Sequence, residues 1–174
     1  GALERLRVAH VTDIHVGRVT PMAIQEAAVE MVNREQPDVV LMTGDYVCHS
    51  QDYLDALTDL VRRYRAPVLA VLGNHDHWAG ADEVRAALRR GGVEVLDNVH
   101  TQITLRHQPI QIVGVDDAYT SHASISRAVR GLRPDVPSIG LTALGSYAQQ
   151  LPKAERPQYY NGMINFIARY AAKE

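Results

Sequence analysis

The chain has 174 residues, a length that fits one domain able to bury a hydrophobic core. Hydrophobic residues make up 46% of it and charged residues 22%, which excludes an intrinsically disordered chain. The formal net charge of -2 argues against a basic nucleic-acid-binding protein. The single cysteine, Cys48, excludes an intramolecular disulfide framework and a zinc site built from cysteines.

Nothing in the sequence indicates a membrane segment. No apolar run reaches the roughly 20 residues of a membrane-spanning helix, and no signal peptide is visible. The chain begins with Gly1 rather than Met, so an upstream segment, including an anchor, could be missing. We expect a protein of the cytoplasm, or one held at the cytoplasmic side of a membrane without a span of its own.

Strands and helices alternate through the first half of the chain. Apolar patterning and capping residues predict strand, helix, strand, helix, strand and helix at 6–12, 21–36, 38–43, 52–64, 67–72 and 81–90. The second and third strands are continuous apolar runs, which is typical of strands buried on both faces. Such alternation predicts an α/β fold with a parallel sheet and right-handed crossovers.

The second half has a different pattern. Residues 101–105 and 110–115 alternate between apolar and polar, which predicts a hairpin. A short helix is expected at 124–130. Further helices are expected at 141–151 and 158–173, and the last of these has an apolar stripe at helical spacing.

Each of the three parallel strands ends in residues that can bind a metal. Asp13-Ile14-His15 follows the first strand, Gly44-Asp45 the second and Gly73-Asn74-His75-Asp76 the third. In open parallel sheets, ligands bind beyond the carboxyl ends of the strands. Carboxylate, imidazole and amide oxygen together suit a divalent metal such as Mn, Fe or Zn. The sequence therefore predicts a metal site at this edge of the sheet.

The same segments resemble a known set of motifs. Thr12-Asp-Ile-His15, Thr43-Gly-Asp-Tyr-Val47 and Val71-Leu-Gly-Asn-His-Asp76 are similar to the D-x-H, G-D and G-N-H-D/E motifs of the calcineurin-like metallophosphoesterase superfamily, in its bacterial phosphohydrolase branch. The resemblance covers roughly residues 5–140. It implies a layered sandwich of two sheets flanked by helices. It also implies a metal-dependent hydrolase of a small phosphomonoester, phosphodiester or pyrophosphate, acting through a metal-activated water.

The resemblance implies metal-binding roles for four residues. Asp13 and His15 would bind one ion, Asp45 would bridge two ions, and Asn74 would bind the second. The ions would be two divalent metals, Mn, Fe or Zn. Two such ions polarise a phosphoryl group and lower the pKa of a water between them.

The resemblance also implies two catalytic residues. His75 would face the phosphate and stabilise or protonate the leaving oxygen, and Asp76 would orient or charge His75. A simpler role for Asp76 is to cap a turn or a helix. His77 and Trp78 are expected to line the rim or to pack, and His49 to be a solvated loop residue.

The sequence departs from the family after about residue 140. Thr142-Ala143 stand where the first of three later metal-binding histidines is expected, and no glycine–histidine pair occurs. We therefore expect an incomplete second sheet and a divergent helical tail at about 141–174, within a single domain spanning 1–174. The tail helix either packs on its own domain or joins two chains into an oligomer.

This departure keeps a second interpretation of function open. The chain could be a non-catalytic or impaired binding module on the same fold, or its site could be completed by another chain. Metal content per chain separates these alternatives, since the scaffold needs no ion. The net charge argues mildly against a long nucleic acid as the substrate.

Overall fold

The computed structural model describes residues 3–143. The greater part of the predicted helical tail, with its suggested oligomer contact, lies outside these residues. Residues 141 and 142, predicted to open a helix, belong instead to a strand. Within 3–143, none of the helices combines the length and the apolar character needed to cross a bilayer.

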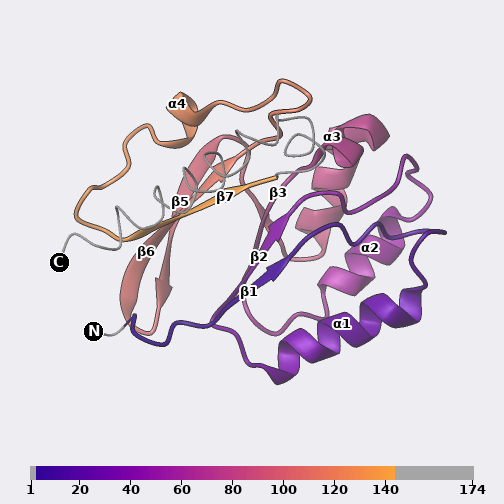
Figure 1. The fold of residues 1–174 in the computed structure, drawn as a ribbon, viewed down its shortest axis with the longest axis horizontal. Coiled ribbons are helices and arrows are strands. Elements are labelled where there is room, and N and C mark those ends of the chain that lie inside the picture. Colours follow the sequence, from indigo (N-terminus) through magenta and orange to yellow (C-terminus); the bar gives the residue numbers. More distant parts are fainter. Residues whose placement is uncertain (1–2, 144–174) are drawn as a thin grey trace, which may run out of the picture.

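The first sheet has four parallel strands in the order β1-β2-β3-β4. The strands are β1 (Val8–Val11), β2 (Val39–Thr43), β3 (Val68–Val71) and β4 (Glu94–Val95). The helices that connect them are α1 (Met22–Arg34), α2 (Leu54–Val61) and α3 (Asn74–Arg90) (Figure 1). The predicted alternation and the parallel sheet are confirmed.

The second sheet has three strands in the described residues, in the order β5-β6-β7. They are β5 (Val99–Leu105), β6 (Gln108–Val115) and β7 (Ser138–Thr142), and the short helix α4 (Ile125–Ala128) precedes β7. β5 and β6 form the predicted hairpin, while β7 runs parallel to β6. The hairpin turn is only Arg106-His107, both with positive φ, because the strand pairing continues to Leu105 and Gln108.

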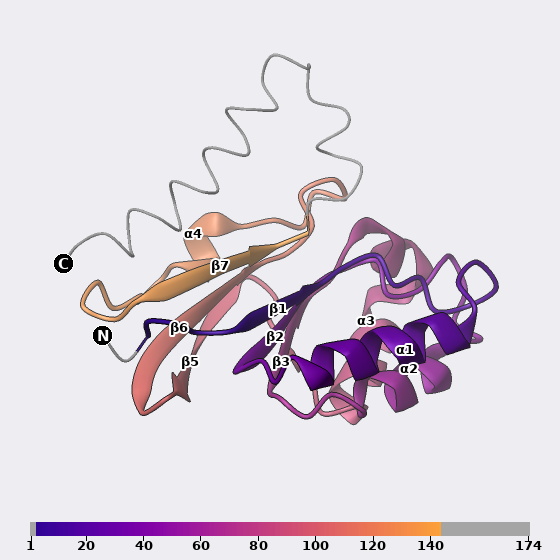
Figure 2. The same ribbon diagram turned by 60° about the horizontal axis from the view of Figure 1, so that its bottom comes forward.

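The two faces of β2 belong to two different cores. Val40 and Met42 face the helices, and Val39 and Leu41 face the second sheet. Figure 2 shows the resulting layers, with α1, α2 and α3 on one side of the first sheet and the β5-β6-β7 sheet on the other. Burial on both faces explains why β2 is a continuous apolar run. The layered α/β sandwich is confirmed.

Helix α3 begins earlier than predicted. The sequence places its start near residue 81, but the helix starts at Asn74 and is kinked at Gly80, where φ is 118°. The Asp76 carboxylate accepts a hydrogen bond from the Gly73 N–H at 2.9 Å, which closes the first turn. Gly73-Asn74-His75-Asp76 is therefore the start of a helix rather than a loop.

Candidate metal centre and active site

The loops that leave β1 and β2 run side by side past the ends of their strands. The N–H of Asp13 donates to the carbonyl of Gly44 at 3.1 Å, and the N–H of His15 donates to the carbonyl of Asp45 at 3.0 Å. Asp13, His15 and Asp45 have φ values of 53°, 42° and 58°, which non-glycine residues seldom adopt. Such backbone strain gathers at functional sites, where the surrounding contacts maintain it.

These loops bring three predicted metal ligands together. The ligand atoms of Asp13, His15 and Asp45 all lie within 4.8 Å of one another, and Asp13 Oδ1 is 3.9 Å from His15 Nε2. Burial raises the pKa of Asp45, and the charge of Asp13 adds to this effect, whereas the N–H of His75 opposes it. A cation between the two carboxylates would offset the cost of keeping both charged.

Asn74, the fourth predicted ligand, has a buried and unpartnered oxygen. The residue is 1% exposed, and its Oδ1 accepts no hydrogen bond from the described residues. The Nδ1 atom of His15 is likewise buried without a partner among them. Buried polar atoms in native proteins nearly always have a partner, so each such exception needs an explanation. Carboxylate, imidazole and amide oxygen donors fit a divalent metal, which would satisfy them.

Two glycines allow the loops after β2 and β3 to approach each other. Gly44 has a φ of 92°, and a Cβ atom there would collide with the backbone of Gly73. A Cβ atom on Gly73 would in turn collide with the carboxylate of Asp45. The glycines therefore set the separation between Asp45 and the start of α3.

Asp76 takes the simpler of the two roles expected for it, that of a cap. Its fully buried carboxylate accepts hydrogen bonds from Gly73 and from the backbone N–H groups of residues 45–47, at 2.8–3.3 Å. It makes no hydrogen bond with His75 in the described structure, because successive helical side chains point about 100° apart. Burial raises the pKa of Asp76 to about 7 against the opposing effect of these N–H groups. Asp76 therefore supports the Asp45 loop and does not orient His75.

His75 lies beside the candidate metal ligands. Its ring centroid is 4.9 Å from that of His15, and its Nδ1 is buried with no hydrogen-bond partner in the part of the chain described. Burial lowers the pKa of His75, and the charge of Asp45, which acts to raise that pKa, only partly offsets the effect. Cys48 also approaches, since its Sγ and ligand atoms of His15 and His75 lie within 4.8 Å of one another.

An aromatic cluster adjoins His75. Trp78 stacks on His49 with centroids 5.4 Å apart and ring planes 8° apart, and it meets His75 and Tyr119 edge-on at 5.0 and 5.8 Å. Trp78 lies at the rim, as expected. His49 is an exposed loop residue, as expected, and its ring also lies 4.6 Å from that of His75. Its position four residues after Asp45, on the same loop, was the available sequence signal.

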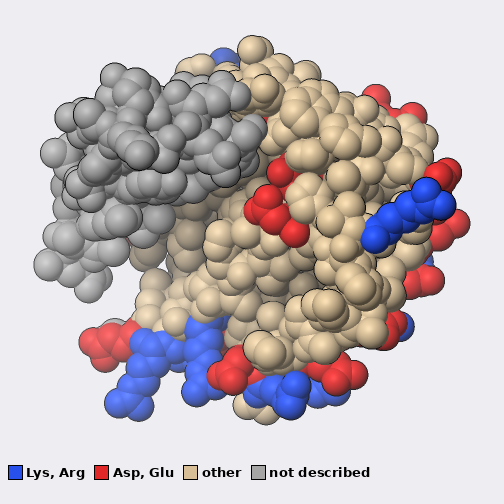
Figure 3. Space-filling view, turned by 45° about the vertical axis from the view of Figure 1, so that its right-hand side comes forward, with Lys and Arg blue, Asp and Glu red and all other residues tan. Residues whose placement is uncertain are grey.

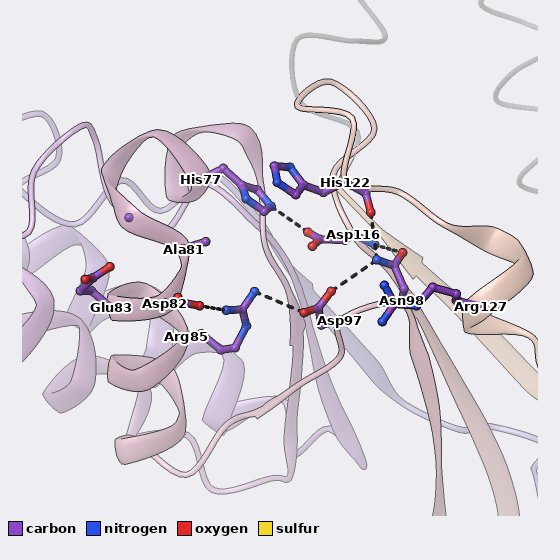
Figure 4. Close-up of a pocket in the computed structure, with 11 residues that line it drawn as sticks. His77, Ala81, Asp82, Glu83, Arg85, Asp97, Asn98, Asp116, His122 and Arg127 are labelled. Carbon is purple, nitrogen blue, oxygen red and sulfur yellow. Dashed lines mark hydrogen bonds and ion pairs between the residues drawn. The ribbon is translucent and has the colours of Figure 1, made fainter.

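A second group of side chains joins the two layers beside this site (Figure 4). His77, from α3, lies 2.9 Å from Asp116, at the end of β6, and stacks on His122 with centroids 4.0 Å apart. Burial alone would lower the pKa of His77, but the hydrogen bond and charge of Asp116 outweigh it and raise that pKa. His77 and Asp116 line a pocket of about 580 Å³. Arg85, which also lines this pocket, forms ion pairs with Asp82 and Asp97. His77 is thus a buried link between the two layers, which is the packing role of the two expected for it.

Charge is unevenly distributed on the side of the molecule toward which β1 and β2 run. In Figure 3, Lys and Arg side chains lie toward the margins, most of them at the bottom and right, and a small acidic cluster lies in a hollow near the centre. The visible part of this face has no continuous basic track. Such a distribution suits a bound cation better than a long polyanion.

The described structure thus packs a parallel sheet, with carboxylate, imidazole and amide donors at its carboxyl edge, on a second sheet. Residues 6–153 match the family model described as calcineurin-like phosphoesterase, and the chain belongs to that family. The family hydrolyses phosphoesters and generally uses divalent metals, which agrees with the donor set present here.

Individual relatives support the same class. The chain is 26% identical over 141 residues to the uncharacterized metallophosphoesterase YkoQ of Bacillus subtilis (strain 168), a match that covers 75% of this chain and 50% of YkoQ. It is 27% identical over 145 residues to phosphodiesterase YaeI of Escherichia coli (strain K12), covering 74% and 53%. The chain thus spans about half the length of these relatives. The crystal structure of TT1561 of Thermus thermophilus has the same fold, with a TM-score of 0.53 and 17% identity over 79% of this chain and 67% of that one.

Proposed function

We propose that the chain hydrolyses a phosphodiester of a small molecule in a reaction that depends on a divalent metal. The observation that carries this proposal is the convergence of Asp13, His15 and Asp45 within 4.8 Å at the carboxyl edge of the sheet. The unpartnered Oδ1 of buried Asn74 adds a fourth donor from the neighbouring strand end. Four donors from three separate strand ends are not explained by loop polarity alone.

Four residues of the chain would bind the metal in this proposal. Asp13, His15, Asp45 and Asn74 would hold the metal, and Asp45 would serve both ions where two are bound. A divalent metal bound there supplies positive charge that polarises the phosphoryl oxygens and makes a water more acidic. The strained loops hold the donors in place before the substrate arrives, so little reorganisation is needed during the reaction.

His75 acts on the leaving group in this proposal. Its ring lies next to His15, and its Nδ1 makes no hydrogen bond to the described residues, so no hydrogen bond from that atom commits the ring to a structural role there. A positioned N–H can donate to the oxygen that departs and stabilise its developing charge. Asp76 contributes indirectly, because it holds the backbone of residues 45–47.

Similarity and charge together favour a small phosphodiester as the substrate. The relative YaeI is named a phosphodiesterase. The net charge of -2 and the margin position of the basic side chains in Figure 3 are unfavourable for a long nucleic acid. A small phosphorylated molecule needs only the local donors described above.

Hydrolysis of bis(p-nitrophenyl) phosphate and p-nitrophenyl phosphate with added Mn²⁺ tests this proposal, together with metal analysis of the protein. We expect turnover of the diester that a chelator abolishes. Asp45→Asn should lose both bound metal and turnover, whereas Asp82→Asn, on the rim of the neighbouring pocket, should lose neither. Activity that resists the chelator would refute the metal mechanism. Bound metal without turnover of either ester would favour a non-catalytic binding module.

A further inference from the structure

Three exposed aromatic side chains from distant segments meet at one place. His49 comes from the loop after β2, Trp78 from the first turns of α3, and Tyr119 from the loop after β6. Trp78 is 49% exposed and Tyr119 36%, and the Trp78 ring contacts both of the others. The three aromatic side chains therefore form a contiguous, solvent-exposed cluster. Such a cluster is more typical of a binding site than of scattered surface residues.

The geometry of the cluster suits a flat ligand. The ring planes of His49 and Trp78 are nearly parallel, 8° apart, and the two rings stack. The ring of Tyr119 stands almost perpendicular to that of Trp78, at 79°. Offset-stacked and edge-to-face contacts are the arrangements that aromatic rings prefer. Recognition by such a cluster would rest on contact between rings rather than on ion pairing.

The position of the cluster indicates which part of a substrate it would contact. The Trp78 centroid is 5.0 Å from that of His75, and the His49 centroid is 4.6 Å from it. His75 is the residue that faces the leaving group in the proposed function. A leaving group that departs past His75 would therefore lie against Trp78.

We propose that His49, Trp78 and Tyr119 form a subsite that binds a planar aromatic ring in the leaving group of the substrate, a nucleobase or a simple aryl group. This inference rests on the proposed function for its placement of the phosphate. A flat ring gains from a single exposed aromatic face, and such stacking tolerates different bases because every base has a π-face. An acyl chain would instead need an enclosed apolar cavity. The neighbouring pocket is lined by charged side chains such as Asp82, Arg85 and Asp97 and is not such a cavity.

The chain offers a direct probe, because Trp78 is its only tryptophan. Intrinsic fluorescence is titrated with AMP, with adenosine, and with ribose 5-phosphate, which keeps the sugar and phosphate but lacks the ring. We expect AMP and adenosine, but not ribose 5-phosphate, to quench Trp78. Calorimetry should show AMP binding about tenfold more tightly than ribose 5-phosphate.

Substitutions then test whether the preference belongs to the ring of Trp78. Trp78→Ala should abolish the advantage of AMP over ribose 5-phosphate, and Trp78→Phe should retain part of it. Ile24→Ala, which shortens another exposed apolar side chain on α1, should leave it unchanged. Phenyl phosphate tests whether a simple aryl group suffices. If it binds more tightly than AMP, the subsite prefers a simple aryl group; if it binds more weakly, the subsite prefers a nucleobase.

The outcomes separate this subsite from the proposed function. Equal binding of AMP and ribose 5-phosphate by the parent, or an undiminished preference in Trp78→Ala, would overturn the subsite even if the chain hydrolyses phosphodiesters. A ring preference that depends on Trp78 in a chain that hydrolyses neither nitrophenyl ester would uphold the ring site and refute the proposed function.

Discussion

The hydroxyl of Tyr46 is a single group that connects the ends of two strands. Tyr46 is fully buried directly after Asp45, and its hydroxyl donates to the Val71 carbonyl at 2.6 Å and accepts from the Gly44 N–H at 2.9 Å. Burial raises the pKa of this hydroxyl well above its ordinary value, so it remains protonated and able to donate. The substitution Tyr46→Phe removes only the oxygen and leaves the ring in place.

The expected cost follows from these two hydrogen bonds. Each buried polar group that loses its partner costs about 1 kcal/mol or more, because neither water nor another donor replaces it. The ring keeps its packing, so no large cavity contributes. We therefore expect Tyr46→Phe to lower the free energy of unfolding by about 2 kcal/mol. Since Gly44 precedes Asp45, metal affinity should fall as well.

Urea unfolding followed by far-UV circular dichroism measures the first effect, and metal titration measures the second. Tyr53→Phe is the matched control, because no hydrogen bond of the Tyr53 hydroxyl is found within residues 3–143, and it should change stability by less than about 0.5 kcal/mol. If both variants unfold at the same urea concentration as the parent, the hydroxyl does not hold the two strand ends together and our reasoning is refuted.

Three further substitutions test other parts of the site. His75→Ala should slow phosphodiester turnover by about 10²–10⁴ while leaving the bound metal, measured by elemental analysis, unchanged; an unaltered rate would remove His75 from the mechanism. His77→Gln should cost about 2 kcal/mol near pH 5.5 and much less near pH 9 in urea unfolding. The pKa of His77 is raised, so its contribution is complete below the ordinary imidazole pKa and is lost as the pH rises through the raised value. The pKa of Asp116 is lowered despite its burial, so the contribution of the pair to stability is also lost as the pH falls through the lowered pKa of Asp116. An equal cost of His77→Gln near about pH 5.5 and near about pH 9 would contradict the ion pair. Gly73→Ala should lower both stability and bound metal, because the added Cβ would collide with the Asp45 carboxylate; parent-like metal content would show that the loops can separate without loss.

Local patterns in the sequence were enough to predict three of the four strands of the first sheet and the candidate metal-binding residues at their ends. The continuous apolar run of β2 requires burial on both faces, and a strand of this kind needs helices or another sheet on each side. Parallel strands joined by helices bring their carboxyl ends to one edge, so Asp13, Asp45 and Asn74 had to come near one another whatever the details of packing. The family motifs added the roles that the residue types alone leave open.

Contacts between residues far apart in the chain decided the rest. The Asp76 carboxylate caps the start of α3 locally, by accepting from the Gly73 N–H. It also accepts hydrogen bonds from the N–H groups of residues 45–47, about 30 positions away, which no local pattern predicts. These contacts make Asp76 a support for the Asp45 loop as well as the cap that the sequence offered as its simpler role. The pairing of His77 with Asp116, 39 positions apart, depends on how the second sheet packs against α3. Periodicity and capping report on neighbours within a few residues. The sequence by itself therefore determined the alternation of strands and helices and the types of donor at the strand ends, and only the packing of one layer on the other decided which side chains meet.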